Sequence, residues 1–206
     1  MKYIYCSGPL FCPEEIAGMS AMARILEDAG FATFLPHRDG IERLVMGLVN
    51  TPLNTNFLGS REIIDKAIFA LDVFQIVKRC DCLVLNMNGR VPDEGAVAEA
   101  GIAFASGKPV VIYKNDARTI FKGRDNSMIT GLSGYPVVRE LNKLPGIIKD
   151  IKPSQTELAG RLLEVANYGE KIWFILKMLP SGRINKKQQN ELINDIIKIS
   201  EVQADN

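Results

Sequence analysis

The segment from Cys82 to Tyr113 places the strongest constraint on the fold of this chain. It holds two short apolar runs, Cys82–Leu85 and Val110–Tyr113, separated by a turn rich in Gly and Pro and by a helix-forming stretch from Glu94 to Ser106. Two short strands joined by a crossover helix form a parallel βαβ unit. Both strands are apolar throughout, as expected when helices cover both faces of a sheet. The segment therefore predicts an α/β fold.

The same alternation of strand and helix patterns extends over most of the chain. The expected strands are 2–6, 31–35, 81–85, 110–113 and a short one at 136–138, and the expected helices are 13–30, 60–79 and 94–106. Ser60 is the expected N-cap of the second helix, after a long irregular connection that begins at Pro36. The order predicts a doubly wound, flavodoxin-like parallel sheet of five strands flanked by helices.

The chain ends in a helical extension. Ser154–Glu157 has the form of a capping box, and two amphipathic helices are expected after it, with a break at Pro180–Gly182. We therefore expect an α/β domain over residues 1–150 and a C-terminal helical extension over residues 151–206. The apolar stripes of the extension favour extra packing or an oligomer interface over a separate activity.

Charge and composition exclude several classes of protein. Among 206 residues, 25 Lys and Arg balance 24 Asp and Glu without a basic stripe, which argues against nucleic-acid binding. No apolar run is long enough to span a membrane, and a strand pattern begins at Lys2 without room for a signal peptide, so a cytoplasmic protein is expected. The four cysteines lack paired spacing and favour buried thiols over a disulfide or a metal site. We expect neither a metal nor an organic cofactor.

Common catalytic motifs are missing from the loops. The first turn, Cys6–Leu10, lacks the G-x-G-x-x-G pattern of dinucleotide-binding proteins, and Gly107–Lys108 is followed by Pro instead of the Ser or Thr of a P-loop. His37 is the only histidine, and no nucleophile motif accompanies it, so it is expected to contact ligand or solvent from a loop. The remaining candidates are carboxylates: Asp72, Asp93, Glu99 and Asp116.

Glu99 is the most informative of these carboxylates. It lies in the helix 94–106 among Gly, Ala, Val, Ile and Phe, with no Lys or Arg at the positions that could pair with it. One interpretation is a glutamate that faces solvent on a helix packed by its other side. The other is a nucleophile or base in a cleft with walls of small residues, near a helix N-terminus.

Asp93 and Asp72 also allow two interpretations each. Asp93 is a candidate N-cap and equally a candidate ligand for a substrate hydroxyl, whereas Asp72 lies near a helix end and could simply be solvated. Asp93 and Glu99 are six positions apart and so face different directions on a helix. Exchange of a glycosyl bond needs two carboxylates from different elements, one nucleophilic and one that donates a proton, which would suit Glu99 and Asp72.

The loops that carry these residues are expected at one edge of the sheet. In doubly wound sheets, ligands bind beyond the carboxyl ends of the strands. This rule brings four segments to one crevice: 7–11, 36–40, 86–93 and 114–118.

Taken in order, these segments resemble the nucleoside 2-deoxyribosyltransferase family. The motifs that carry the resemblance are Ile4–Phe11, Pro36–Gly40, Asp72, Asp93–Gly101 with Gly107–Pro109, Asp116–Arg118 and Asn126–Met128. The run from Asp93 to Glu99 with its trailing Gly-Lys is the most specific, and the order and spacing of the others add to it.

The resemblance implies roles for three catalytic residues. Glu99 would attack the anomeric carbon of a 2-deoxyribose and form a covalent deoxyribosyl-enzyme. Asp72 would exchange a proton with the base as it leaves and as the next base attacks, and Tyr5 would orient the nucleophile.

The resemblance also implies a set of substrate-binding residues. Asp93 would hold a sugar hydroxyl, and Asn126 and Met128 would belong to a segment that a neighbouring subunit lends to the pocket, which implies a homo-oligomer with shared active sites. The remaining members of the set are in the opening motif and in the loop that would read the base: Gly8, Phe11, His37 and Arg38.

The function predicted from the resemblance is exchange of the base of a 2′-deoxynucleoside, with the nucleoside and a free nucleobase as partners. One alternative is hydrolysis of the N-glycosidic bond of a 2′-deoxynucleoside 5′-monophosphate, which would need a phosphate site drawn from Ser7, Arg38, Arg90 and Arg118. A further alternative is a non-catalytic nucleotide-sensing module on the same scaffold.

Overall fold

The computed structural model describes residues 1–45, 55–89, 91–117, 125–152, 157–179 and 185–204. They fall into two compact units: unit 1 contains Met1–Leu35 and Gln75–Leu158, and unit 2 contains Pro36–Phe74 and Ala159–Asn206. The sequence analysis assigned residues 36–74 to the α/β domain, whereas in the structure they group with the C-terminal helices. The division at residue 150 stays a prediction.

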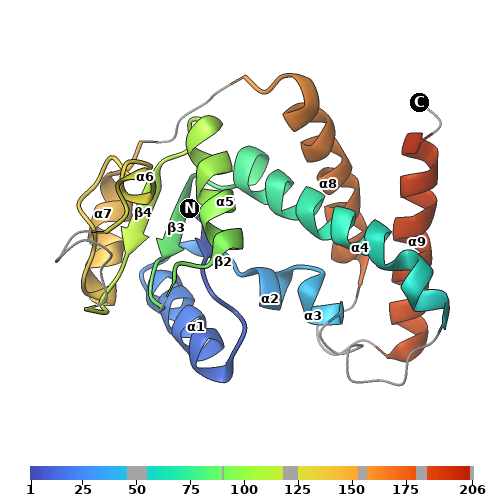
Figure 1. Cartoon of the computed structure of the whole chain (residues 1–206), viewed down its shortest axis with the longest axis horizontal. Helices are drawn as coiled ribbons and strands as arrows, with labels where there is room; N and C mark the ends of the chain where they lie inside the picture. Colours follow the sequence, from blue (N-terminus) through green and yellow to red (C-terminus); the bar gives the residue numbers. More distant parts are fainter. Residues whose placement is uncertain (46–54, 90, 118–124, 153–156, 180–184, 205–206) are drawn as a thin grey trace. The chain divides into compact units, whose positions relative to one another are not determined.

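Unit 1 is built on a parallel sheet, as predicted (Figure 1). Its strands are β1 (Tyr3–Ser7), β2 (Ala32–Phe34), β3 (Cys82–Asn86) and β4 (Val110–Tyr113), in the order β2-β1-β3-β4. All three strand pairings are parallel, and Tyr5 of the central strand β1 lies opposite Phe34 and Leu83. This order is the flavodoxin-like order without its last strand.

The prediction of five strands is wrong by one among the described residues. The predicted strand at 136–138 contributes a single bridge between Val138 and Tyr113. Val138 accepts a hydrogen bond from Lys114 N and donates one to Ile112 O, but Pro136 has no amide hydrogen with which to extend the ladder.

Helices cover both faces of the sheet in unit 1. The helices are α1 (Pro13–Asp28), α5 (Glu94–Ala105), α6 (Ser127–Thr130) and α7 (Leu144–Asp150), with a π-helix η1 (Gln75–Arg79) and a 3-10 turn η2 (Leu141–Lys143). Helices α1 and α7 bury Leu26 and Ile148 against one face, in a core that also holds Ile4, Cys6 and Val84 of the strands. Alternate residues of a strand point to opposite faces, so Tyr5 and Ser7 face α5 instead.

Unit 2 is helical. It contains α2 (Pro36–Asp39), α3 (Glu42–Val45), α4 (Thr55–Phe74), α8 (Gly160–Met178) and α9 (Lys186–Ala204). Helix α8 packs directly on α4, since a Cβ added to Gly169 would lie 1.9 Å from Ala70 O. A hydrogen bond between the Tyr168 and Ser200 hydroxyls joins α8 to α9. The predicted helical extension is confirmed, but Ser60 lies inside α4 and does not cap it.

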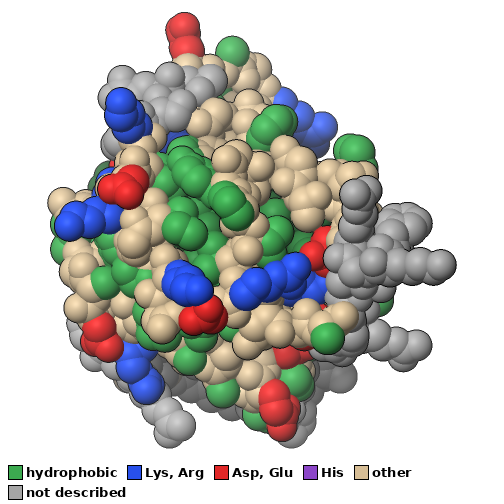
Figure 2. All heavy atoms as spheres, turned by 90° about the vertical axis from the view of Figure 1, so that its left-hand side faces the viewer, with side chains coloured by type: hydrophobic (Ala, Val, Ile, Leu, Met, Phe, Trp, Pro, Cys, Tyr) green, Lys and Arg blue, Asp and Glu red, His purple; other side chains and the backbone are tan. Residues whose placement is uncertain are grey.

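The surface carries charges of both signs. Figure 2 shows one face of the molecule on which hydrophobic side chains gather, with basic and acidic side chains around them. In the part of the chain that the structure describes, no helix is both long enough and apolar enough for a membrane span.

Candidate active site

Two hydroxyl groups of β1 hold the Glu99 carboxylate in unit 1. The Tyr5 hydroxyl donates to Glu99 Oε1 over 2.8 Å, and the Ser7 hydroxyl donates to Glu99 Oε2 over 2.5 Å. Each carboxylate oxygen therefore has its own donor, which fixes the plane of the carboxylate as well as its position.

The local sequence explains this arrangement of the Tyr5 and Ser7 hydroxyls on Glu99, which we call the clamp. Tyr5 and Ser7 are two positions apart on a strand, so both side chains point to the same face of the sheet. Both residues are fully buried, and the Tyr5 ring stacks on Phe34 of β2 with centroids 5.4 Å apart. Neither hydroxyl can turn toward solvent, so both remain directed at Glu99.

Helix α5 supplies the other half of the clamp. Its buried stripe consists of Ala96, Ala100 and Ala103, and these small residues let the helix backbone lie close to the sheet. The Ser7 hydroxyl lies 3.3 Å from the carbonyl oxygen of Ala96 as a result. Asp93 begins the helix as its N-cap and accepts a hydrogen bond from Ala96 N over 2.6 Å. The capping interpretation of Asp93 is confirmed, while its contact with a sugar hydroxyl stays a prediction.

Gly8 and Phe11 lie just beyond the carboxyl end of β1. A Cβ on Gly8 would lie 2.6 Å from Met19 Sδ and 2.8 Å from Asn86 Cβ, so this position has room only for glycine. The Phe11 side chain is 84% exposed, while its backbone N–H donates to Glu15 at the start of α1. Phe11 is thus available to a ligand or to another subunit, and both binding roles stay predictions.

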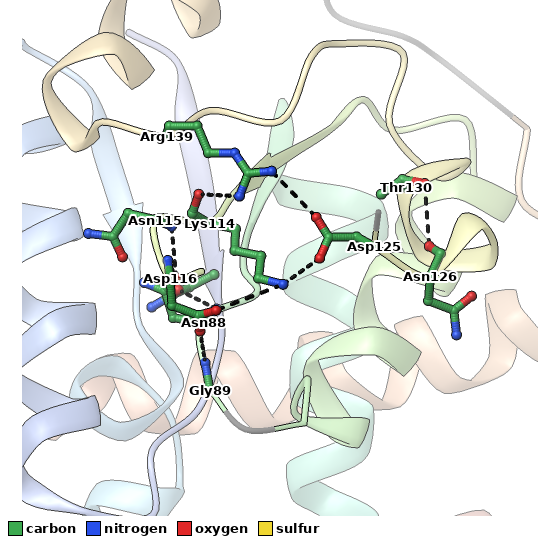
Figure 3. A network of polar contacts seen from close by, with 10 residues as sticks. Asn88, Gly89, Lys114, Asn115, Asp116, Asp125, Asn126, Thr130 and Arg139 are labelled. Carbon is green, nitrogen blue, oxygen red and sulfur yellow. Dashed lines mark hydrogen bonds and ion pairs between the residues drawn. The ribbon is translucent and has the colours of Figure 1, made fainter. Parts of the chain in front are cut away.

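A buried ionic network organises the loops after β3 and β4 (Figure 3). Lys114 is paired with Asp125, and both side chains are about 95% buried. Lys114 also lies 3.9 Å from Asp116, and Asp116 accepts a hydrogen bond from Gly89 N. Arg139 completes the network through the Lys114 carbonyl and Asp125. The candidate carboxylate Asp116 therefore has a structural role here.

The network fixes the start of α6, where two predicted substrate-binding residues lie. Asn126 caps α6 and accepts a hydrogen bond from Met128 N over 2.9 Å, and the Met128 side chain is 79% exposed. The contribution of Asn126 and Met128 to a neighbouring pocket stays a prediction.

The other three predicted residues belong to unit 2. His37 Nδ1 is buried and has no hydrogen-bond partner among the described residues. Burial lowers the pKa of His37, and the Arg38 charge lowers it further, while Asp39 opposes both. Arg38 pairs with Asp39 at 2.9 Å.

Asp72 is 9% exposed near the end of α4. Burial raises the pKa of Glu42, and its backbone amide and the Asp72 side chain offset part of that rise.

The sequence analysis named Ser7 only as a possible phosphate ligand and did not foresee its hydrogen bond to Glu99. It did not name Glu42, whose pKa burial raises. Ser7 could have been found from the strand periodicity, since it shares a face with Tyr5. Glu42 lies in a connection that was expected to be irregular, so no periodic signal was available. Arg90 and Arg118, two candidate phosphate ligands, lie outside the described residues.

A carboxylate whose two oxygens accept hydrogen bonds from buried hydroxyls is oriented, and an oriented carboxylate can act as a nucleophile, for example toward a sugar carbon. The comparison with protein families agrees, because the model of the nucleoside 2-deoxyribosyltransferase family matches residues 4–163. The chain belongs to this family, which is of the glycosyltransferase type. Most of helix α8 and all of α9 lie outside the match.

Solved structures similar to this chain are distant in sequence. A 2-deoxyribosyltransferase of Bacillus psychrosaccharolyticus is 20% identical, with a TM-score of 0.47 over 76% of this chain and 99% of that one. A 2-deoxyribosyltransferase of Leishmania mexicana is 18% identical, with a TM-score of 0.39 over 68% and 91%. A conserved protein of Enterococcus faecalis is 16% identical, with a TM-score of 0.36 over 86% and 98%. A search among curated proteins found no match.

Proposed function

We propose that this protein exchanges the base of 2′-deoxynucleosides through a covalent deoxyribosyl-Glu99 intermediate. The observation that carries the proposal is the clamp on Glu99, whose two carboxylate oxygens each accept a hydrogen bond from a buried hydroxyl. Membership of the nucleoside 2-deoxyribosyltransferase family supports 2-deoxyribose as the sugar and base exchange as the reaction.

The mechanism follows from the charge that develops on the sugar. Cleavage of the N-glycosidic bond passes through an oxocarbenium-like state, and an oriented carboxylate stabilises this positive charge before it bonds to the anomeric carbon. A second base then attacks from the face that the first base left. Two inversions at one carbon retain the configuration of the nucleoside.

Asp72 is the proposed proton donor to the departing base, and Asp93 the proposed ligand of a sugar hydroxyl. His37 and Arg38 are proposed to face the base. Phe11 and Met128, both strongly exposed, support the further proposal of a homo-oligomer in which subunits share the pocket.

The hydrolytic alternative is less well supported. It needs a phosphate site, and the Ser7 hydroxyl that would contribute to one already donates to Glu99. Arg38, a second candidate, is paired with Asp39. A nucleoside substrate places no such demand on these groups.

The test is intact-mass measurement after mixing the protein with a 2′-deoxynucleoside. We expect an adduct of deoxyribosyl size in the wild type and none in Glu99→Gln, whose amide is a poor nucleophile but has nearly the same shape. Supplying a second base should discharge the adduct and give a new nucleoside. Free sugar as the sole product would favour hydrolysis, and absence of both adduct and turnover would favour a sensing module.

A further inference from the structure

Hydrogen bonds in both directions tie the loop after β3 to the loop after β4 in unit 1 (Figure 3). The side-chain oxygen of Asn88 accepts hydrogen bonds from Asn115 N over 2.9 Å and from Asp116 N over 3.3 Å. In return, the Asp116 carboxylate accepts one from Gly89 N over 2.8 Å. Each loop therefore supplies an acceptor to the other. We call the four residues that make these contacts the loop junction: Asn88, Gly89, Asn115 and Asp116.

Lys114 joins the loop junction to the segment that begins α6. Its ammonium group pairs with the Asp125 carboxylate and lies 3.9 Å from that of Asp116. An ammonium group has three N–H donors, so it can serve both carboxylates at once. Asp125 directly precedes Asn126, whose side chain caps α6 by accepting a hydrogen bond from Met128 N over 2.9 Å. One lysine thus connects segments that are separate in the sequence.

The position of Lys114 is itself fixed by the sheet. Lys114 follows Tyr113, the last residue of β4, and its backbone N–H donates to Val138 O over 2.9 Å. Its carbonyl accepts a hydrogen bond from Arg139 over 3.1 Å. The Lys114 and Asp125 side chains are both nearly fully buried, and separating them would leave a buried charge without this partner. The pair therefore holds its geometry more strongly than an exposed ion pair would.

The segments that Lys114 connects carry the ligands that we propose for the sugar. Asp93 lies four residues after Gly89 of the loop junction, and Asn126 directly follows Asp125. Both loops emerge from the carboxyl ends of strands, at the edge of a doubly wound sheet where ligands bind. Lys114 is itself only 5% exposed, so its effect on a bound ligand would pass through these segments.

We propose that Lys114 is a positioning residue for the sugar. It holds the loop that leads to Asp93 and the segment of Asn126 and Met128 at a fixed separation, so that both are in place when a 2′-deoxynucleoside binds. The inference rests on the proposed function, which supplies the roles of Asp93, Asn126 and Met128. In the proposed oligomer, one Lys114 serves its own pocket through the loop of Asp93 and the neighbouring pocket through Asp125.

Binding measured without turnover tests this role. Thymidine and 2′-deoxyadenosine, one pyrimidine and one purine nucleoside, are titrated by calorimetry into Glu99→Gln and into Glu99→Gln combined with Lys114→Met. Methionine keeps most of the length of the lysine side chain but carries no charge. We expect the Kd of a nucleoside that binds to rise about tenfold or more, the equivalent of one lost hydrogen bond to a charged group. An equal Kd in the two proteins would overturn the proposal.

The Kd separates positioning from mere folding. A variant that only folds less well shows fewer binding sites in the titration, whereas the Kd of the remaining sites is unchanged. Leu26→Ala in the Glu99→Gln background is the matched control. Leu26 is fully buried near the end of α1, and β2 begins shortly afterwards, so Leu26 lies toward the amino ends of the strands, opposite to the loops. Its substitution should reduce stability but leave the Kd unchanged. A rise equal to that of Lys114→Met would overturn the positioning role.

Asp125→Asn is a second variant, and it decides the question if Lys114→Met does not fold. The amide has the shape of the carboxylate but no charge, so we expect a smaller rise in Kd, of at least about threefold. Combining Asp125→Asn with Lys114→Met should raise the Kd no further than Lys114→Met alone, because both substitutions remove the same pair. An unchanged Kd in Asp125→Asn, or effects that multiply in the combined variant, would overturn the proposal.

Failure of this inference can be told apart from failure of the proposed function. Formation of an adduct on Glu99 in the wild type tests the function and does not depend on the Kd. If the adduct forms but the Kd does not respond to Lys114→Met, only the positioning role is refuted. If no adduct forms while the Kd rises as described, the proposed chemistry fails and the positioning of a bound nucleoside stands. If neither nucleoside binds to Glu99→Gln, the inference is overturned.

Discussion

Replacing Ser7 by Ala should lengthen the lifetime of the covalent intermediate. In the second half-reaction of the proposed mechanism, Glu99 would leave the sugar as a carboxylate. In the structure the Ser7 hydroxyl donates to one oxygen of this carboxylate over 2.5 Å. The ester of the intermediate is uncharged and gains less from the same donor. Removal of the hydroxyl therefore raises the barrier to discharge more than it raises the energy of the intermediate.

The size of the effect follows from the charge on the acceptor. A hydrogen bond to a charged group contributes about 1.5–3 kcal/mol. Since about 1.4 kcal/mol corresponds to a tenfold change in rate, discharge should slow roughly 10- to 150-fold. Ser7 is fully buried, and alanine fits its space without a new contact.

A pulse-chase experiment measures this lifetime directly. The protein is loaded with a 2′-deoxynucleoside, a second base is added in excess, and the adduct is followed by intact mass. Ser106→Ala is the control, because Ser106 is a buried serine at the end of the helix that carries Glu99, and its hydroxyl donates to the Ile102 and Ala103 carbonyls. Its adduct should decay at the wild-type rate. If the adduct of a folded Ser7→Ala protein also decays at that rate, the clamp has no part in the chemistry.

Three further predictions concern stability. Gly8→Ala should lower the free energy of unfolding by about 1–3 kcal/mol in denaturant titrations, because the new methyl group would lie 2.6 Å from Met19 Sδ. An unfolding midpoint equal to that of the wild type would contradict this close packing. Lys114→Met should cost up to about 3–5 kcal/mol in the same assay, because among the described residues the buried Asp125 would keep only its longer ion pair with Arg139 at 3.6 Å. A loss below about 1 kcal/mol would mean that the pair of Lys114 and Asp125 is hydrated. Burial lowers the pKa of His37, so the unfolded state binds a proton at His37 more readily than the folded state does. The free energy of unfolding of the wild type should therefore fall relative to that of His37→Gln as pH drops below about 6.5. Parallel pH profiles of the two proteins would refute the lowered pKa.

The fold was predictable where local periodicity and burial agree. The strands β1, β3 and β4 are apolar runs flanked by turns, and their parallel pairing follows from the helices between them. The prediction of a fifth strand was wrong because a run of three residues that begins with Pro136 gives no periodic signal, and the ladder there is limited to one bridge. The start of α4 was misplaced because Ser60 is a favourable cap that the longer helix leaves unused.

The candidate site was predictable to a lesser extent. The small residues around Glu99 indicated a close approach, and the resemblance supplied Tyr5. Strand periodicity places Ser7 on the same face as Tyr5, but the separation of α5 from β1, which brings Ser7 to the same carboxylate, has no local pattern. Glu42 was unpredictable for a different reason. Its carboxyl is folded back against Gly40 within a connection between short helices, so no periodic pattern indicates its burial.

The hydroxyls around Glu99 suit the role proposed for this carboxylate. Glu99 accepts hydrogen bonds from two neutral hydroxyls, which favour the ionised form that a nucleophile requires. The two donors come from one face of β1, so the strand presets the orientation of the carboxylate before any ligand binds. Substitution of Ser7 or Tyr5 is therefore as informative about the proposed chemistry as substitution of Glu99 itself.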